Sequence, residues 1–194
     1  TPRSSSAASD VYKRQPLLLL HGYPQTGFMW HKIAPRLAED FTVVVSDLRG
    51  YGDSDKPTSS EDHAVYSKRA MAADMMAVMT ALGHSQFFIA GHDRGGRVAH
   101  RLARDYPQAV TKLAMLDIAP TAMMYDTTDM HFATSYYHWF FLIQPAPFPE
   151  TLIGSDPKFF LESKMQHWGK DRSAITNDAF DEYLRCFSNP DTIH

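Results

Sequence analysis

An aspartate between two glycines is the first feature of this sequence whose residue types and spacing could do chemistry. In Gly91-His92-Asp93-Arg94-Gly95, each glycine stands two positions from Asp93, the spacing of a tight turn that presents a nucleophile between a strand and a helix. A carboxylate is ionised at neutral pH, so it can attack carbon without the general base that a serine needs. Asp93 could equally cap the helix that begins at Arg94, and the motif alone does not separate the two interpretations.

Two arginines, Arg94 and Arg97, follow the aspartate within one helical turn. Residues three apart lie on neighbouring faces of a helix, so both guanidinium groups could reach the same small space. A guanidinium offers a planar pair of N–H donors that matches a carboxylate, and such a pair would orient a small acid in front of Asp93. A solvated basic patch on the helix is the alternative.

A further candidate is Asp117, which lies in the apolar segment KLAMLDI at residues 112–118. A carboxylate at the end of a strand could orient a histidine, but it could also be an ordinary capping aspartate. The segment His21-Gly22-Tyr23-Pro24 directly follows the first apolar run. Taken alone, it is typical of a turn that ends a strand.

These residues need a scaffold, and the chain supplies short apolar runs that alternate with helical patterns. Strands are expected at residues 16–20, 41–45, 86–90 and 112–118, and helices at 28–38, 67–83 and 94–105. In the second expected helix, four apolar residues recur at helical spacing and form a stripe that predicts core packing: Met71, Met75, Val78 and Leu82. This helix is expected to end at Gly83. Residues 47–57 are rich in Gly, Asp and Pro and are expected to be irregular. The alternation predicts an α/β fold, a parallel sheet covered by helices.

The pattern changes after Pro120, where aromatic residues and prolines crowd YYHWFFLIQPAPFPE and no further alternation of strands and helices follows. We expect a partial core at residues 16–134 and a helical cap at residues 135–194. Residues 1–15 are polar, lack an initiating methionine and are interpreted as a non-native leader. The chain stops at FSNPDTIH without a closing element, so we expect the protein to be a fragment.

Composition argues against several classes of function. With 194 residues, 44% of them hydrophobic, the chain can bury a core. A net charge of -3 offers no basic face for nucleic acid, and no apolar run is long enough to suggest a membrane partner. The single cysteine, Cys186, cannot form an internal disulfide, which favours a cytoplasmic location but would also suit a secreted chain without disulfides. We expect no metal and no cofactor, and the sequence leaves a homodimer open.

Several segments together carry a family resemblance: HGYPQTGFMWHKIAPRLAEDFTVVVSDLRGYGDSDKP, GHDRGGRVAHRLARDYPQAV, KLAMLDIAPT, and SYYHWFFLIQPAPFPE with IGSDP. They resemble the fluoroacetate and haloacetate dehalogenases of the α/β-hydrolase superfamily, from about residue 16 to residue 194. GHDRGGR with the YHW of the cap is more specific than the turn motif alone. The resemblance implies an α/β-hydrolase fold with an incomplete sheet and a helical cap. It also implies hydrolysis of fluoroacetate or chloroacetate to glycolate and halide through an aspartyl ester.

The resemblance assigns a role to each candidate in the core. Asp93 becomes the nucleophile, and Asp117 orients a histidine base. The backbone amides of Tyr23 and Arg94 form the oxyanion hole. The side chains of Arg94 and Arg97 hold the carboxylate of the substrate.

The same resemblance places the leaving halide against the cap. His138 and Trp139 would each donate an N–H to the halide, although they could also belong to an aromatic cap core. Trp168 is matched more loosely to a tryptophan that faces the substrate pocket. The catalytic histidine and a halide-pocket tyrosine of the family are expected beyond residue 194, so the chain by itself is expected not to turn over substrate.

Two other functions stay open. An epoxide hydrolase would use the same nucleophile with a cap tyrosine, Tyr136 or Tyr137, to protonate the epoxide oxygen, and it has no use for paired arginines. A non-catalytic binding protein of the same fold is disfavoured because Asp93, its two glycines and Asp117 are all present. In the favoured reading the partner is a small haloacid.

Overall fold

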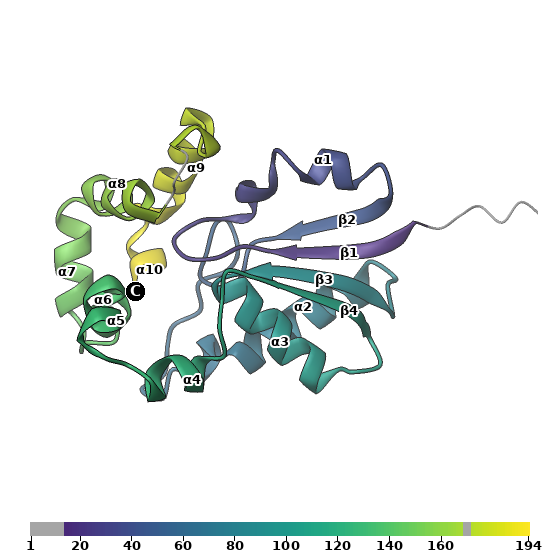
Figure 1. The fold of residues 1–194 in the computed structure, drawn as a ribbon, viewed down its shortest axis with the longest axis horizontal. Helices are drawn as coiled ribbons and strands as arrows, with labels where there is room; N and C mark the ends of the chain where they lie inside the picture. The colour runs from purple at the N-terminus through teal and green to yellow at the C-terminus, as the bar shows by residue number, and fades with distance from the viewer. Residues whose placement is uncertain (1–13, 169–171) are drawn as a thin grey trace, which may run out of the picture.

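The computed structural model describes residues 14–168 and 172–194 of the chain. Within these residues, the centre of the fold is a parallel sheet of four strands in the order β2-β1-β3-β4 (Figure 1). The strands are β1 (Gln15–Leu20), β2 (Phe41–Ser46), β3 (Phe87–His92) and β4 (Val110–Leu116). The parallel sheet expected from the sequence is confirmed, although β1 begins one residue inside the expected leader.

Helices cover both faces of this sheet (Figure 1). On one face lie α2 (Lys68–Ala81) and α3 (Arg94–Asp105), and on the other lie the 3-10 helix η1 (Gly27–Trp30) and α1 (Ala34–Leu37). A further 3-10 helix, η2 (Ala64–Tyr66), precedes α2. Double coverage of this kind buries the apolar run of the inner strand β1, whereas the edge strands β2 and β4 are more exposed.

The middle strand β1 shows this coverage residue by residue. Leu18 and Leu20 pack into the cluster formed with α2 and α3, whereas Leu17 and Leu19 pack with Trp30 on the opposite face. Successive side chains of a strand point to opposite sides. An unbroken run of leucines therefore marks a strand that is buried on both faces.

The apolar stripe predicted for α2 is partly wrong. Met71 and Met75 are buried as expected, but the last buried residue is Met79, and Leu82 is 54% exposed. Leu82 lies after the final residue of α2, and the chain turns at Gly83, where φ is +81°. The helix therefore ends before the expected stripe completes its last turn.

The single helix expected at residues 28–38 is also wrong, since this segment divides into η1 and α1. Pro35 stands in the first turn of α1. Proline lacks the amide that a continuous helix would need and clashes with the preceding turn, whereas it fits the start of a helix. The chain therefore restarts its helix at residue 34.

Strand pairing moves the ends of the third and fourth strands from their expected positions. β3 extends to His92, and β4 starts at Val110 and ends at Leu116. The paired register joins Phe87 to Val110 and His92 to Leu116, so hydrogen bonding between strands, not composition, sets these limits. Asp117 consequently lies one residue past β4, with φ of 50°.

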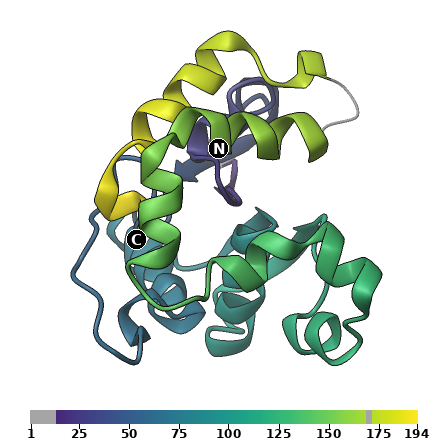
Figure 2. The ribbon, with the colours of Figure 1, turned by 90° about the vertical axis from the view of Figure 1, so that its left-hand side faces the viewer.

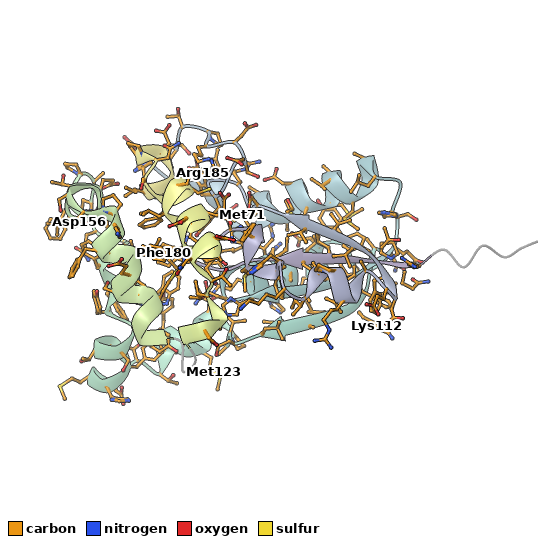
Figure 3. All side chains as sticks on the ribbon, turned by 90° about the horizontal axis from the view of Figure 1, so that it is seen from above. Met71, Lys112, Met123, Asp156, Phe180 and Arg185 are labelled. Atoms are coloured by element: carbon orange, nitrogen blue, oxygen red, sulfur yellow. The ribbon has the colours of Figure 1, made fainter. Side chains whose placement is uncertain are left out.

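After β4, the described chain consists of helices joined by turns and loops and contains no further strand. Its helices are α4 (Thr121–Asp126), α5 (Met130–Ser135), α6 (Tyr137–Phe141), α7 (Phe148–Ser155), α8 (Pro157–Trp168), η3 (Arg172–Ala174), α9 (Asn177–Phe187) and α10 (Pro190–Ile193). They lie beyond the carboxyl ends of the strands (Figures 1 and 2). In Figure 3 the labelled Asp156 and Phe180 belong to this cap, while Lys112 of β4 lies toward the far end of the sheet. None of the described helices is long and apolar enough to cross a membrane.

The helical layer has an apolar core of its own, which includes a residue of the sheet domain. Ile153 and Leu161 are buried in this core, and Tyr23, from the loop after β1, packs into the same cluster. At the rim, Arg185 of α9 donates to both carboxylate oxygens of Asp53 at 3.0 Å. Cap and core are thus joined by apolar and ionic contacts, and the expected boundary near residue 134, which falls inside α5, stays a prediction.

Candidate active site

Asp93 occupies a sharp turn between β3 and α3. Its backbone has φ of 49° and ψ of -116°, and a positive φ outside glycine is a strained conformation that concentrates at functional sites. A Cβ on Gly91 would lie 2.3 Å from the carbonyl oxygen of Gly95, and a Cβ on Gly95 would lie 2.4 Å from that of His21. Only glycine fits at both positions, and this allows the turn to pack against the end of β1.

The carboxylate of Asp93 is held by the loop after β1 and not by its own helix. Asp93 stands at the N-cap position of α3, but its side chain makes no capping bond to the helix, so the prediction that it satisfies the free amides of α3 is wrong. Instead, Oδ1 accepts a 2.9 Å hydrogen bond from the backbone N–H of Tyr23. Gly22 permits this approach, because a Cβ there would lie 2.6 Å from the Cβ of Asp93. One carboxylate oxygen is fixed in this way, and Oδ2 faces no comparable donor among the described residues.

Asp93 lines a cavity of about 980 Å³ whose walls come from both the core and the cap. Four other residues predicted from the sequence line it too: Tyr23, Asp117, His138 and Trp139. The side chain of Asp117 is 93% exposed, and its Oδ2 lies 3.9 Å from His92 Nε2, which is longer than a hydrogen bond. Its role in orienting a base stays a prediction. Within the described residues, no cluster of His, Cys, Asp and Glu could hold a metal ion.

The guanidinium of Arg94 is enclosed by aromatic side chains. Its central carbon lies 4.7 Å from the ring centroid of Trp139 and 5.3 Å from that of Tyr23, a favourable arrangement for a guanidinium. Nη1 donates to the hydroxyl of Tyr51 at 3.1 Å. Burial raises the pKa of Tyr51, so this hydroxyl stays neutral and holds the guanidinium without cancelling its charge.

Arg97 contacts two residues of the cavity wall without lining the cavity itself. Its central guanidinium carbon lies 5.4 Å from the Trp139 ring, and Nη2 lies 3.6 Å from Met124 Sδ. Nε is buried and has no hydrogen-bond partner among the described residues, which is unfavourable unless a ligand supplies an acceptor. Trp139 and Met124 line the cavity, whereas Arg94 and Arg97 are not among its lining residues. The carboxylate-clamp role of the two arginines therefore stays a prediction.

His138 and Trp139 lie side by side on α6, with ring centroids 4.7 Å apart. His138 is 2% exposed, and burial, reinforced by the charges of Lys164 and Arg94, lowers the pKa of His138 to about 4. Its imidazole is therefore neutral at pH 7 and carries one N–H donor. Trp139 belongs to the apolar core of the cap as well as to the cavity wall.

Comparison with known proteins decides the family. Residues 15–191 match the alpha/beta hydrolase fold. The chain belongs to the α/β-hydrolase family. It is 50% identical over 183 residues to a fluoroacetate dehalogenase of Burkholderia sp, an alignment that covers 92% of this chain and 59% of that protein. It is 34% identical over 181 residues to a soluble epoxide hydrolase of Corynebacterium sp. (strain C12), covering 92% of this chain and 62% of that protein.

A solved structure agrees with this assignment to the hydrolase fold. A putative alpha/beta hydrolase from Nostoc sp PCC 7120 superposes with a TM-score of 0.92 at 63% identity, over 93% of this chain and 62% of that one. The chain thus spans about three fifths of the length of each relative. The predicted α/β-hydrolase fold is confirmed, and the chain is related to a fluoroacetate dehalogenase and to epoxide hydrolases.

Two contacts beside the predicted site residues involve side chains that the sequence did not indicate. Tyr51, from a loop expected only to be irregular, holds Arg94. Lys164 of α8 is 4% exposed, and its Nζ donates to the hydroxyl of Tyr137 at 2.5 Å. Lysine is rarely buried, so no spacing rule would have found it. Trp168 ends α8, and its side chain lies outside the described part of the structure, so its predicted place in the pocket is not tested.

Proposed function

We propose that this chain carries the nucleophile of a hydrolase that removes halide from haloacetates through an ester on Asp93. The observation that carries the proposal is the Asp93 carboxylate, which lines a large cavity from a strained turn with one oxygen fixed by the Tyr23 amide. Attack at a saturated carbon needs an ionised nucleophile that does not depend on a neighbouring base, and a carboxylate meets this requirement. The relationship to a fluoroacetate dehalogenase supports the same choice.

In the proposed first step, Asp93 Oδ2 attacks the carbon that bears the halogen. A carbon–oxygen bond forms, the carbon–halogen bond breaks, and the halide leaves with the bonding electrons. The product is an ester that joins Asp93 to a glycolate unit. The neutral imidazole of His138 and the indole of Trp139 would donate N–H groups to the departing halide.

In the proposed second step, water attacks the carbonyl carbon of this ester, and a base takes the proton of the water. Oδ1 of Asp93, already bonded to the Tyr23 N–H, becomes the carbonyl oxygen of the ester and then the oxyanion. The amide therefore points at the atom where negative charge develops, which is the requirement for an oxyanion hole. The amide of Arg94, the first residue of α3, is the proposed second donor.

Arg94 and Arg97 would hold the acid end of the substrate. The buried Nε of Arg97 lacks an acceptor among the described residues, and a substrate carboxylate would supply one. Charge-assisted bonds of this kind contribute about 1.5–3 kcal/mol each. To make them, the substrate must reach past Trp139 or Met124, which separate the guanidinium groups from the cavity.

The ester can be sought in the 194-residue chain itself, because its formation needs no base. The chain is incubated with chloroacetate, digested and analysed by mass spectrometry. We expect one carboxymethyl group on the peptide that contains Asp93, and none in an Asp93→Asn variant. Burial raises the pKa of Cys186 to about 11, so its thiol should react slowly near neutral pH, and its modification would be seen on a separate peptide. An unmodified Asp93 peptide in the parent would overturn the proposal.

The clamp is tested by comparing chloroacetate with uncharged chloroacetamide. Arg97→Ala should slow esterification of Asp93 by chloroacetate about tenfold or more, the equivalent of one charge-assisted bond, and should change the reaction with chloroacetamide much less. Arg104→Ala, at the exposed end of the same helix, serves as the control and should alter neither rate. Equal losses on both reagents would argue against a carboxylate clamp.

One observation favours epoxide hydrolysis as a second candidate. Tyr136 lines the same cavity as Asp93, where its hydroxyl could protonate an epoxide oxygen, and the chain is related to an epoxide hydrolase. The same mass measurement with a small neutral epoxide decides between them. An ester that forms with the epoxide, is lost in Tyr136→Phe and does not form with chloroacetate would replace the dehalogenase proposal.

A further inference from the structure

A second cavity, of about 170 Å³, lies beside the first and is lined by basic side chains. Its polar wall consists of Lys68, Arg97, His100, Arg101 and Thr121. Ala119 lines both cavities, so the two spaces meet at the chain that follows β4. Arg97 also contacts Trp139 in the wall of the larger cavity, and it therefore stands between the two.

The charges in this smaller cavity are not balanced. Arg101 is neutralised, since its guanidinium donates to both oxygens of Asp105 at 2.7 and 2.5 Å. For Lys68 and Arg97 the contacts are to sulfur and to an aromatic ring: Lys68 Nζ lies 3.8 Å from Met71 Sδ, and Arg97 lies beside Met124 and the Trp139 ring. Within residues 14–168 and 172–194, no carboxylate forms an ion pair with either cation.

The protein environment already disfavours the charge of Lys68. Burial, followed by the charges of Arg94 and Arg97, lowers the pKa of Lys68 to about 7, and the nearby Asp93 opposes this shift without cancelling it. A partly buried cluster of like charges is destabilised by desolvation and by repulsion. A bound anion would remove both penalties, because it would supply the missing counter-charge.

We propose that this basic cavity binds a small inorganic anion and receives the halide that is released beside Asp93. The volume accommodates a small anion together with water, since about 170 Å³ corresponds to the space of roughly six water molecules. Ala119 lines both cavities, so the halide would pass along the chain that follows β4. The identity of the anion as product halide rests on the proposed function, whereas the anion site itself does not.

Bromide is the probe, because its anomalous scattering locates it directly. In crystals of the chain soaked in sodium bromide, we expect a peak between Lys68 and Arg97. Lys68→Met should remove this peak and Lys68→Arg should keep it, because arginine retains the charge. Lys158→Met, which removes an exposed lysine paired with Glu162 on α8, is the matched control and should leave the peak unchanged. A parent crystal with bromide only in the larger cavity, or with none, would overturn the proposal.

A solution measurement gives the affinity. Bromide should raise the urea midpoint of the parent by ligand linkage, and Lys68→Met should weaken its apparent affinity about tenfold, the loss of one charged contact. Equal affinity in the parent and in Lys68→Met would place bromide elsewhere and refute the site. If Lys68→Met fails to fold, Lys68→Arg and the parent decide. The chloroacetate assay on the same proteins separates the two proposals: a parent that binds bromide here but forms no ester keeps the anion site and loses the dehalogenase function.

Discussion

Replacing Gly95 by alanine tests whether the turn at Asp93 depends on direct contact between backbones. A Cβ at this position would lie 2.4 Å from the carbonyl oxygen of His21 and 2.5 Å from that of Leu20, and real Cβ atoms essentially never approach closer than 3.0 Å. The obstructing atoms are backbone, so α3 or the end of β1 must move by at least about 0.6 Å to clear the smaller distance. Gly154 of α7 offers a matched control, since a Cβ there would meet nothing within 4 Å.

The magnitude follows from two opposing terms. Overpacking typically destabilises by about 1–3 kcal/mol, and two backbone oxygens place Gly95→Ala at the upper end of that range. Alanine in a helix gains up to about 1 kcal/mol over glycine, and this gain applies to both variants. We therefore expect Gly95→Ala to lose about 2 kcal/mol of unfolding free energy and Gly154→Ala to gain up to about 1 kcal/mol.

Urea denaturation measures the difference. At an m-value of about 2 kcal/mol/M, the midpoints of the two variants should differ by about 1.5 M, with Gly95→Ala below the parent and Gly154→Ala at or above it. Gly95→Ala should also slow chloroacetate modification of Asp93, because the displaced loop carries the Tyr23 amide. A Gly95→Ala midpoint equal to or above that of the parent, or equal shifts in both variants, would refute the packing argument for this turn.

Two further predictions concern the cap. Because the pKa of His138 falls from 6.5 to about 4 on folding, the unfolded chain takes up a proton that the folded chain refuses, so this residue contributes stability above pH 6.5 that is lost toward pH 4. Between about pH 7 and about pH 5 the unfolding free energy of the parent should fall by about 2 kcal/mol through this residue, which urea titrations at several pH values measure. A His138→Gln variant whose unfolding free energy falls as steeply with decreasing pH as that of the parent would contradict this prediction. Thr176 accepts a bond from the Ala179 N–H at the start of α9, so Thr176→Ala should cost about 1 kcal/mol. Thr134→Ala, where the threonine bonds within its own helix, should cost less, and equal losses by thermal unfolding would remove the capping explanation.

Local spacing was enough to predict much of the core. The leucine run predicted a buried strand and the β-branched run predicted a second strand, and the limits of α3 followed from the residues alone. The glycines around Asp93 predicted a tight turn. A Cβ on Gly91 would clash with Gly95 inside the turn itself, whereas the clash at Gly95 is with the backbone of Leu20 and His21 and arises from packing against β1. The two wrong predictions also have local causes. Leu82 lies past the end of α2 and is therefore exposed, and Pro35 divides the single helix expected at residues 28–38.

The chemistry of the site, in contrast, was decided by contacts between distant parts of the chain. Asp93 is bonded to an amide 70 residues away, and Arg94 to a hydroxyl 43 residues away. The burial that shifts the pKa of His138, and the meeting of Lys68 with Arg97, likewise exist only once α2, α3 and α6 are packed. Residue types and spacing identified the groups that could act and the turn that presents them, because strand and helix periodicity and the steric limits inside a tight turn involve residues close along the chain. Which oxygen is held, which charges lack a partner and which side chains share a cavity became known only from the packed fold, because burial and hydrogen bonding depend on neighbours that spacing does not reveal.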